Sequence, residues 1–244
     1  MKKNKCRLNK RGKFAIYAFI LLVILLIYIC ISSSIFELKE VSLNGNNKIT
    51  KNDVVKIASI EEGKNIFKYN LKDIEEKLLG NPYIKYAKAT RKFPDKLVIN
   101  IKENSEDAII KDGKSYVYLG MDGLVLSEKK EITNKNIPLV SGIQIKDKQV
   151  NTKVKINSNK SNYIILTIDT LKKNNMSRKI ESININQNTM IMKTDDNTNI
   201  SLKLDEDIVY NINRLKAILV DLKTSNKKGG SVDLTSKEQA IYSP

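Results

Sequence analysis

One uninterrupted run of apolar residues stands out in the hydropathy pattern of the chain. Residues 14–31 (FAIYAFILLVILLIYICI) hold eighteen consecutive apolar side chains. A helix of that length spans ~27 Å, close to the ~30 Å hydrocarbon thickness of a bilayer. Tyr17 and Tyr28 lie near its two ends, where aromatic rings favour the headgroup level. The pattern therefore predicts a transmembrane helix over residues 14–35.

The residues before this run are strongly basic. They include seven cations and no acid, namely Lys2, Lys3, Lys5, Arg7, Lys10, Arg11 and Lys13. Because positive charge is retained on the cytoplasmic side of a membrane, residues 1–13 are expected to form a cytoplasmic tail. Everything after the helix is then extracytoplasmic, in a single-pass arrangement.

Two other interpretations of the apolar run are less well supported. A cleaved signal peptide has an apolar core of ~7–15 residues and a small-residue cleavage site of the Ala-x-Ala kind. This core is longer, and residues 32–34 (SSS) match such a site poorly. A lipoprotein would need small residues before its cysteine, whereas Tyr28 and Ile29 precede Cys30. An uncleaved anchor is the preferred interpretation.

Residues 36–104 show the periodicities of a small mixed unit. Alternation over residues 36–43 predicts a strand, and Thr50 with Asp53 predicts a helix N-terminus of the capping-box kind. Asn70 is expected to cap a second helix, with apolar residues at spacings of three and four. Residues 84–91 and 96–103 alternate as two further strands. The predicted order is β-α-α-β-β.

Residues 105–244 predict a second, larger unit of strands with helices. Asp-Gly pairs at 112–113 and 122–123 indicate hairpin turns between strands at 108–110, 116–119 and 124–126. A helix is expected over residues 161–173, followed by strands at 179–186, 189–193 and 199–204. Residues 205–223 have the best amphipathic pattern in the chain, and residues 231–234 (SVDL) follow as a strand. Residues 143–160 and the last ten give no clear pattern.

At this stage the two units carry a resemblance to a known family. The Gly45-Asn46 turn, the loop at 63–67 (GKNIF), residues 81–84 (NPYI), Arg91 with Phe93-Pro94, and the run ending at Glu103 resemble a POTRA domain. Placed directly after a membrane helix, this domain resembles that of the FtsQ/DivIB bacterial cell-division family. The hairpin at 118–126, the segment at 137–142 and the strand at 231–234 resemble the β-domain of the same family. An Arg commonly follows that last strand in the family, where this chain has Thr235.

The resemblance implies an α+β fold and a role in division. The expected domains are the tail (1–13), the transmembrane helix (14–35), the POTRA domain (36–104) and the β-domain (105–244). A non-catalytic protein at the division septum is implied, holding membrane proteins of the FtsB/DivIC and FtsL kind. The candidate partner-binding residues lie on the edge near the C-terminus: Ser231, Val232, Asp233, Leu234 and Tyr242. Val232 and Leu234 could equally be core residues.

Composition argues against several other functions. The net charge of +16 could indicate nucleic acid as a partner, but the lysines are spread evenly and form no patch interleaved with aromatic rings. The only two cysteines, Cys6 and Cys30, fall in the predicted tail and helix, so the exported part has no disulfide. A membrane is expected as a partner, whereas nucleic acid and a small-molecule substrate are not.

The sequence predicts no catalytic, cofactor or metal site. Histidine is absent, which excludes Ser-His-Asp and Cys-His arrangements. Ser-x-x-Lys occurs at Ser127/Lys130 and Ser225/Lys228, without the companion motifs of the enzymes that use it. A calcium-loop pattern at Asp195, Asn197, Asn199 and Glu206 has Ile200 where the loop needs glycine. No phosphate-binding or dinucleotide-binding fingerprint is present.

Two alternative functions remain. A POTRA-containing secretion or chaperone adaptor would normally carry several POTRA units before a membrane β-barrel, and no series of alternating segments here is long enough for a barrel. A membrane-anchored envelope enzyme is the second alternative.

Overall fold

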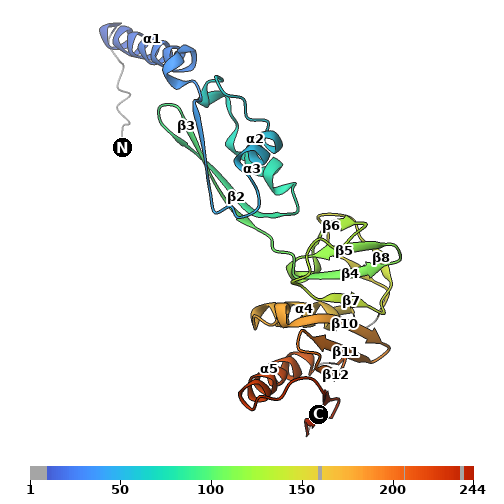
Figure 1. Cartoon of the computed structure of the whole chain (residues 1–244). Coiled ribbons are helices and arrows are strands. Elements are labelled where there is room, and N and C mark those ends of the chain that lie inside the picture. The colour runs from blue at the N-terminus through green and yellow to red at the C-terminus, as the bar shows by residue number, and fades with distance from the viewer. Residues whose placement is uncertain (1–9, 159–160, 206, 237–238) are drawn as a thin grey trace, which may run out of the picture. The chain divides into compact units, whose positions relative to one another are not determined.

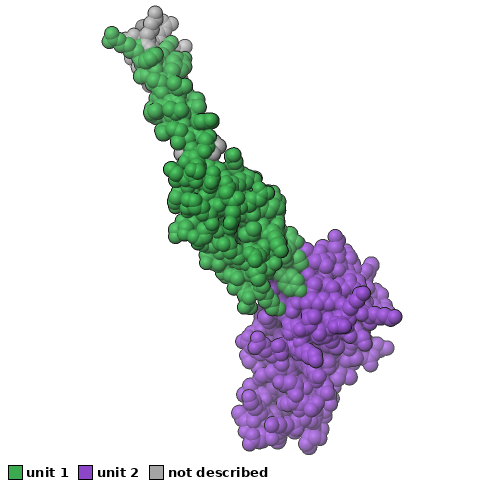
Figure 2. Space-filling model, turned by 45° about the horizontal axis from the view of Figure 1, so that its top comes forward, with its two compact units in different colours: residues 1–103 green, residues 104–244 purple. Residues whose placement is uncertain are grey.

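The computed structural model describes residues 10–158, 161–205, 207–236 and 239–244. The chain forms two compact units, Met1–Glu103 and Asn104–Pro244, which are coloured separately in Figure 2. Each unit has a hydrophobic core of its own, so each is described separately.

The predicted N-terminal helix is present as α1 (Lys10–Ser32), which begins before residue 14 and ends three residues before the predicted end at residue 35. Its segment Arg11–Ile29 is long and apolar enough to cross a membrane. None of this segment is buried against the rest of the protein. It therefore fits a transmembrane anchor, whose apolar side chains are left for lipid. A short 3-10 helix, η1 (Ser34–Phe36), follows directly.

The rest of the first unit has the predicted β-α-α-β-β order (Figure 1). Its elements are β1 (Glu40–Asn44), α2 (Lys51–Ile57), the 3-10 helix η2 (Ile66–Lys68), α3 (Leu71–Leu79), β2 (Ile84–Lys92) and β3 (Lys96–Glu103). The sheet order is β1-β3-β2, with β1 parallel and β2 antiparallel to β3. Helices α2 and α3 contribute Val54, Ile74 and Leu78 to a core that also includes Leu97 and Ile99 of the central strand.

Helices α2 and α3 of this unit begin with the capping residues that the sequence predicts. Thr50 and Asp53 form a reciprocal capping box at the start of α2, and the Asn70 side chain accepts a hydrogen bond from the Lys72 N–H at the start of α3. The first strand is shorter than predicted, because it begins at Glu40 and not at residue 36. Its predicted first half instead bonds to loops: the Leu38 N–H donates to the Lys64 carbonyl and the Lys39 N–H to the Asp95 carbonyl.

The second unit is built on a nine-stranded sheet in the order β14-β13-β12-β11-β10-β7-β4-β5-β6. The strands are β4 (Ala108–Asp112), β5 (Ser115–Leu119), β6 (Val125–Lys129), β7 (Leu139–Ser141), β10 (Ile180–Asn186), β11 (Thr189–Thr194), β12 (Asn199–Lys203), β13 (Ser231–Leu234) and β14 (Ile241–Ser243). The two strands β8 (Ile145–Asp147) and β9 (Lys155–Ile156) pair only with each other, in the segment that had no clear pattern.

The largest differences from the predicted bounds in this unit are at β6 and at the long amphipathic helix. The Asp122-Gly123 turn is a 3-10 helix, η3 (Met121–Gly123), so β6 begins at Val125 and continues to Lys129. The long amphipathic helix is α5 (Ile208–Thr224), and Asp207 stands at its N-cap position. Glu206, part of the predicted acidic start and of the calcium-loop pattern, lies outside the described residues.

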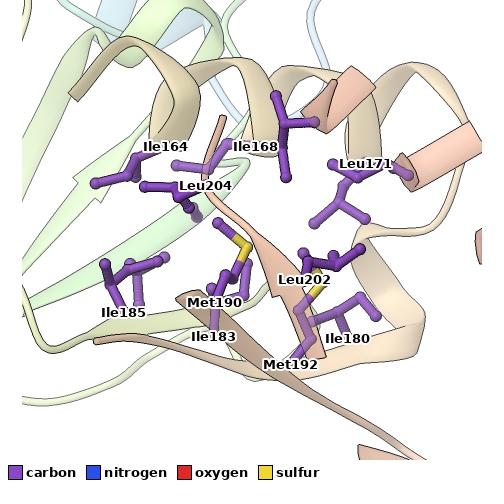
Figure 3. Packing of buried hydrophobic residues seen from close by; sticks show 14 of the residues in the cluster. Ile164, Ile168, Leu171, Ile180, Ile183, Ile185, Met190, Met192, Leu202 and Leu204 are labelled. Atoms are coloured by element: carbon purple, nitrogen blue, oxygen red, sulfur yellow. The ribbon is translucent and has the colours of Figure 1, made fainter. Parts of the chain in front are cut away.

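Two helices cover the core of the second unit. Helix α4 (Ser161–Lys173), after which η4 (Ser177–Lys179) leads into β10, directs Ile164, Ile168 and Leu171 toward the sheet (Figure 3). Met190 and Met192 of β11 meet them from the sheet side, with Leu202 of β12 beside them (Figure 3). Helix α5 adds further apolar residues to the same cluster, namely Ile208, Ile212, Leu215 and Leu222.

Candidate functional site

The predicted partner-binding residues lie at one end of the nine-stranded sheet. Strand β13 has the predicted bounds and pairs in parallel with β12, with Val232 opposite Ile200. On its other side it pairs antiparallel with β14, with Val232 opposite Tyr242. Strand β13 therefore has a neighbour on both sides, and the outermost strand is β14.

The side chains of β13 alternate strictly between core and solvent. Val232 and Leu234 are buried members of the core cluster, whereas Ser231 and Asp233 are exposed. The side chains of Val232 and Leu234 therefore belong to the core. The open edge of the sheet, which was predicted at residues 231–234, is formed by β14. Of the five candidate residues, Tyr242 lies on the edge strand itself.

Strand β14 is short and only partly covered. Ile241 is exposed and Tyr242 is half-buried against the core cluster. The Tyr242 hydroxyl lies 3.3 Å from the Gly229 carbonyl oxygen and donates to it. The Lys227 Nζ lies 5.4 Å from the centre of the Tyr242 ring, a cation–π distance. The Tyr242 side chain therefore links β14 to the residues that directly precede β13.

Glycine is required where β14 approaches that chain. Gly230 has φ +82°, and a Cβ atom there would lie 2.4 Å from the Ser243 carbonyl oxygen. Only glycine fits both the left-handed backbone and this close approach. The Gly229-Gly230 pair therefore lets β14 lie close to the start of β13.

Asp233 caps the end of its own strand. Its Oδ1 accepts a hydrogen bond of 2.8 Å from the Thr235 N–H. This main-chain bond and the Thr235 side chain lower the pKa of Asp233. Thr235, at the position where the family resemblance would place an Arg, thus holds the Asp233 carboxylate in its charged form.

A surface pocket of about 350 Å³ is lined by residues at the end of β11 and at the end of α5, and one of them, Lys227, also lies over the Tyr242 ring. Its lining includes four lysines and two aspartates, together with uncharged residues: Lys179, Thr194, Asp195, Asp196, Leu219, Lys223, Asn226, Lys227 and Lys228. Thr194 and Thr198 hydrogen-bond to the Asp196 carboxylate and lower its pKa. This pocket was not predicted, because Lys179 lies far in the sequence from Lys223, Lys227 and Lys228, and single lysines do not stand out in a chain rich in lysine.

The chemistry available at this edge is that of binding. Across the described ranges, no three His, Cys, Asp or Glu side chains gather so as to hold a metal ion. What the edge offers is the main chain of a terminal strand, an exposed apolar side chain and nearby lysines. Such an arrangement suits the addition of a strand from another chain.

Comparison with known proteins places this chain among division proteins. Residues 36–104 match the family model described as "POTRA domain, FtsQ-type". The chain is 31% identical to the cell division protein DivIB of Clostridium tetani over 224 residues, covering 91% of this chain and 84% of the relative. It is 26% identical to DivIB of Clostridium acetobutylicum, covering 91% and 88%.

A solved structure was also found, that of the major extracytoplasmic domain of DivIB from Geobacillus stearothermophilus. It is 14% identical, with a TM-score of 0.32, and the match covers 50% of this chain and 97% of that one. The identity and coverage of the clostridial relatives, together with the FtsQ-type POTRA match, show that the chain belongs to the DivIB/FtsQ family of cell division proteins.

Proposed function

We propose that this protein is a non-catalytic, single-pass membrane protein that holds other division proteins together at the septum. In the proposed layout, residues 1–13 lie in the cytoplasm and residues 14–35 span the membrane. Residues 36–104 and 105–244 form the two extracytoplasmic domains. The basic residues before α1 support this orientation.

The observation that carries the proposal is the edge strand β14. A terminal strand presents unpaired main-chain N–H and C=O groups, which a partner strand can bond by extending the sheet. Strand β14 is three residues long and ends the sheet. The proposed interface combines this edge with Tyr242, and with Ser231 and Asp233 on the solvent side of β13. Val232 and Leu234 support it from the core.

The proposed partners are short coiled-coil proteins anchored in the same membrane, of the FtsB/DivIC and FtsL kind. Shared anchoring raises the effective concentration of such partners, so a three-residue strand edge can suffice for assembly. The lysines of the pocket, of which Lys227 lies over the Tyr242 ring, would favour a partner segment that carries acidic residues.

A proline scan of β14 tests the proposal. Along an edge strand, N–H groups alternate between the neighbouring strand and the outside. A proline placed singly at Ile241, Tyr242 or Ser243 therefore removes either an N–H that faces β13 or one that faces the open edge. We expect proline at an outward position to abolish co-purification of co-expressed DivIC-like and FtsL-like partners from the same organism. Alanine at the same position keeps the N–H and should retain them.

Two further measurements complete this test. Val232→Pro breaks the pairing of β13 with both neighbours and serves as a reference for loss of the whole edge. Partner capture by all three folded β14 proline variants would refute strand addition. A fluorescent fusion that failed to collect at mid-cell would refute the septal location, and turnover of peptidoglycan, a peptide or an ester by the purified chain would refute the non-catalytic role.

A further inference from the structure

Three phenylalanine rings from three separate segments meet on the surface of the first unit. Phe36 ends η1, Phe67 lies in η2, and Phe93 lies in the turn between β2 and β3. The ring centres of Phe36 and Phe67 are 5.2 Å apart, those of Phe67 and Phe93 are 5.5 Å apart, and those of Phe36 and Phe93 are 6.5 Å apart. We call these three residues the phenylalanine cluster.

The phenylalanine cluster leaves much of its apolar surface in solvent. Phe93 is 61% exposed and Phe67 is 38% exposed, while Phe36 packs partly against the core. Ile35, which directly precedes Phe36, is 62% exposed. A contiguous exposed apolar surface of this kind marks a site of contact with another apolar body.

The surface is held in place by hydrogen bonds. The Arg91 guanidinium donates from Nε to the Ile66 carbonyl at 2.9 Å and from a terminal nitrogen to the Tyr69 carbonyl at 2.6 Å. The Asn65 side chain accepts from the Phe67 N–H at 3.0 Å. These bonds link η2 to β2, so Phe67 is held next to Phe93, which follows the end of β2.

The phenylalanine cluster is tethered very close to the end of the anchor. Helix α1 ends at Ser32, and only residues 33–35 separate it from Phe36. Because an extended chain spans at most ~3.6 Å per residue, Phe36 lies within about 15 Å of the end of that helix. When α1 spans a bilayer, the apolar body nearest to these rings is the bilayer itself.

Exposed lysines stand next to two rings of the phenylalanine cluster. Lys68 follows Phe67 and Lys92 precedes Phe93 in the sequence. Lys39 is paired with Asp95 at 3.5 Å, and Glu37 is an exposed acid next to Phe36. Lysines flanking apolar side chains are typical of surfaces that bind anionic lipid headgroups.

We propose that the phenylalanine cluster and Ile35 insert into the headgroup region of the leaflet next to the end of α1. The inserted rings hold the first unit against the membrane, and the flanking lysines contact anionic headgroups. The first unit is then oriented by the bilayer instead of swinging freely on residues 33–35. This inference rests on the proposed anchoring by α1.

Tryptophan fluorescence provides the test, because the chain contains no tryptophan. The full chain carrying Phe93→Trp is reconstituted in vesicles of phosphatidylcholine with phosphatidylglycerol. Brominated lipids, with bromine placed either near the headgroup or deep in the acyl chain, serve as quenchers. We expect the indole of Phe93→Trp to emit at a shorter wavelength than an indole exposed to water. We also expect the shallow bromines to quench it more strongly than the deep ones.

Two matched variants separate this inference from the anchoring on which it rests. Ile24→Trp places the reporter in α1, where deep bromines should quench it. Tyr86→Trp replaces an exposed ring of the same unit, seven residues from Phe93 and so about 23 Å along β2. Its emission should be quenched little by either lipid.

The outcomes distinguish the two claims. One outcome would overturn only the insertion of the phenylalanine cluster. In it, Ile24→Trp is quenched, but Phe93→Trp is quenched as little as Tyr86→Trp. Absence of quenching at Ile24→Trp would overturn the anchoring and the inference together. Replacing phosphatidylglycerol with zwitterionic lipid should reduce quenching at Phe93→Trp and leave Ile24→Trp unchanged, and equal quenching at Phe93→Trp in both lipids would overturn the role of the lysines.

Discussion

Replacing Glu103 with glutamine removes one charge from the end of β3 and tests how the loop before α2 is held. The Glu103 carboxylate accepts hydrogen bonds from three successive main-chain N–H groups, of Asn47 at 2.7 Å, Lys48 at 3.0 Å and Ile49 at 2.9 Å. Burial raises the pKa of Glu103, but the three hydrogen bonds and the nearby Lys48 charge outweigh it. The net pKa lies below its ordinary value of 4.5.

The expected cost follows from the number and kind of these bonds. A hydrogen bond to a charged group contributes ~1.5–3 kcal/mol. An amide oxygen at position 103 can still accept, without the charge, so we expect Glu103→Gln to lower the free energy of unfolding of the first unit by about 1.5–3 kcal/mol. Since 1.4 kcal/mol is tenfold, protected amides of this unit should exchange roughly tenfold to a hundredfold faster.

Hydrogen–deuterium exchange of the full chain in detergent, read peptide by peptide, measures this effect. Peptides from residues 36–104 should lose protection, and those from residues 105–244 provide an internal control. Glu62→Gln removes an exposed charge from the same unit and should change stability by no more than ~0.5 kcal/mol.

The pH dependence gives a second, independent check. Because the pKa of Glu103 is lowered on folding, its contribution is complete above the unfolded-state pKa and is lost as the pH falls through the folded one. After correction for intrinsic exchange rates, the difference between wild type and Glu103→Gln should be full at pH 7 and shrink at pH values below the ordinary pKa of 4.5. A difference that is absent at pH 7, or that does not shrink in acid, would refute the reasoning.

Three further substitutions and one matched control test the packing, and the same exchange measurement is used for each of them. Ile168→Ala should destabilise the second unit by ~2–5 kcal/mol, since Ile168 is buried on the side of α4 that faces the sheet; a loss under 1 kcal/mol would contradict its place in the core. Gly142→Ala should cost well over ~1 kcal/mol, because its Cβ would lie 2.1 Å from the Ile185 carbonyl oxygen. Gly113→Ala also has positive φ, but no atom lies within 4 Å of its Cβ, so equal costs at the two glycines would contradict the clash. Arg91→Lys should destabilise the first unit by ~1–3 kcal/mol, because lysine lacks the planar guanidinium fork that reaches the Ile66 and Tyr69 carbonyls together; unchanged exchange there would contradict that role.

Most of the secondary structure follows from short-range signals in the sequence. The helix at 161–173 and the strand at 231–234 have the predicted bounds, because spacings of three and four or strict alternation persist to their ends. The first strand was predicted to begin at residue 36, although it begins at Glu40. The error arose because residues 36–39 alternate like a strand but bond to loops that lie far away in the sequence.

The candidate edge shows the same limit. The alternation of Val232 and Leu234 with polar residues predicts a strand, but it does not say which strand lies on either side. Strand β14 pairs with β13 through only three residues, in a segment that had no clear hydropathy pattern. The phenylalanine cluster was equally hidden, because its three rings come from positions 36, 67 and 93 and only the fold brings them together.

The order of strands in the second unit determines when its sheet can be completed. Strand β7 pairs in parallel with β4 on one side and with β10 on the other, and β12 pairs in parallel with β13. Each of these pairings closes a long stretch of chain, which makes such sheets slow to assemble. The meander of β4 to β6 can form from neighbouring residues, but the sheet remains in two pieces until the three residues of β7 join them. We expect a newly made chain to expose strand edges until β7 is inserted, and to be vulnerable to aggregation and proteases for that time.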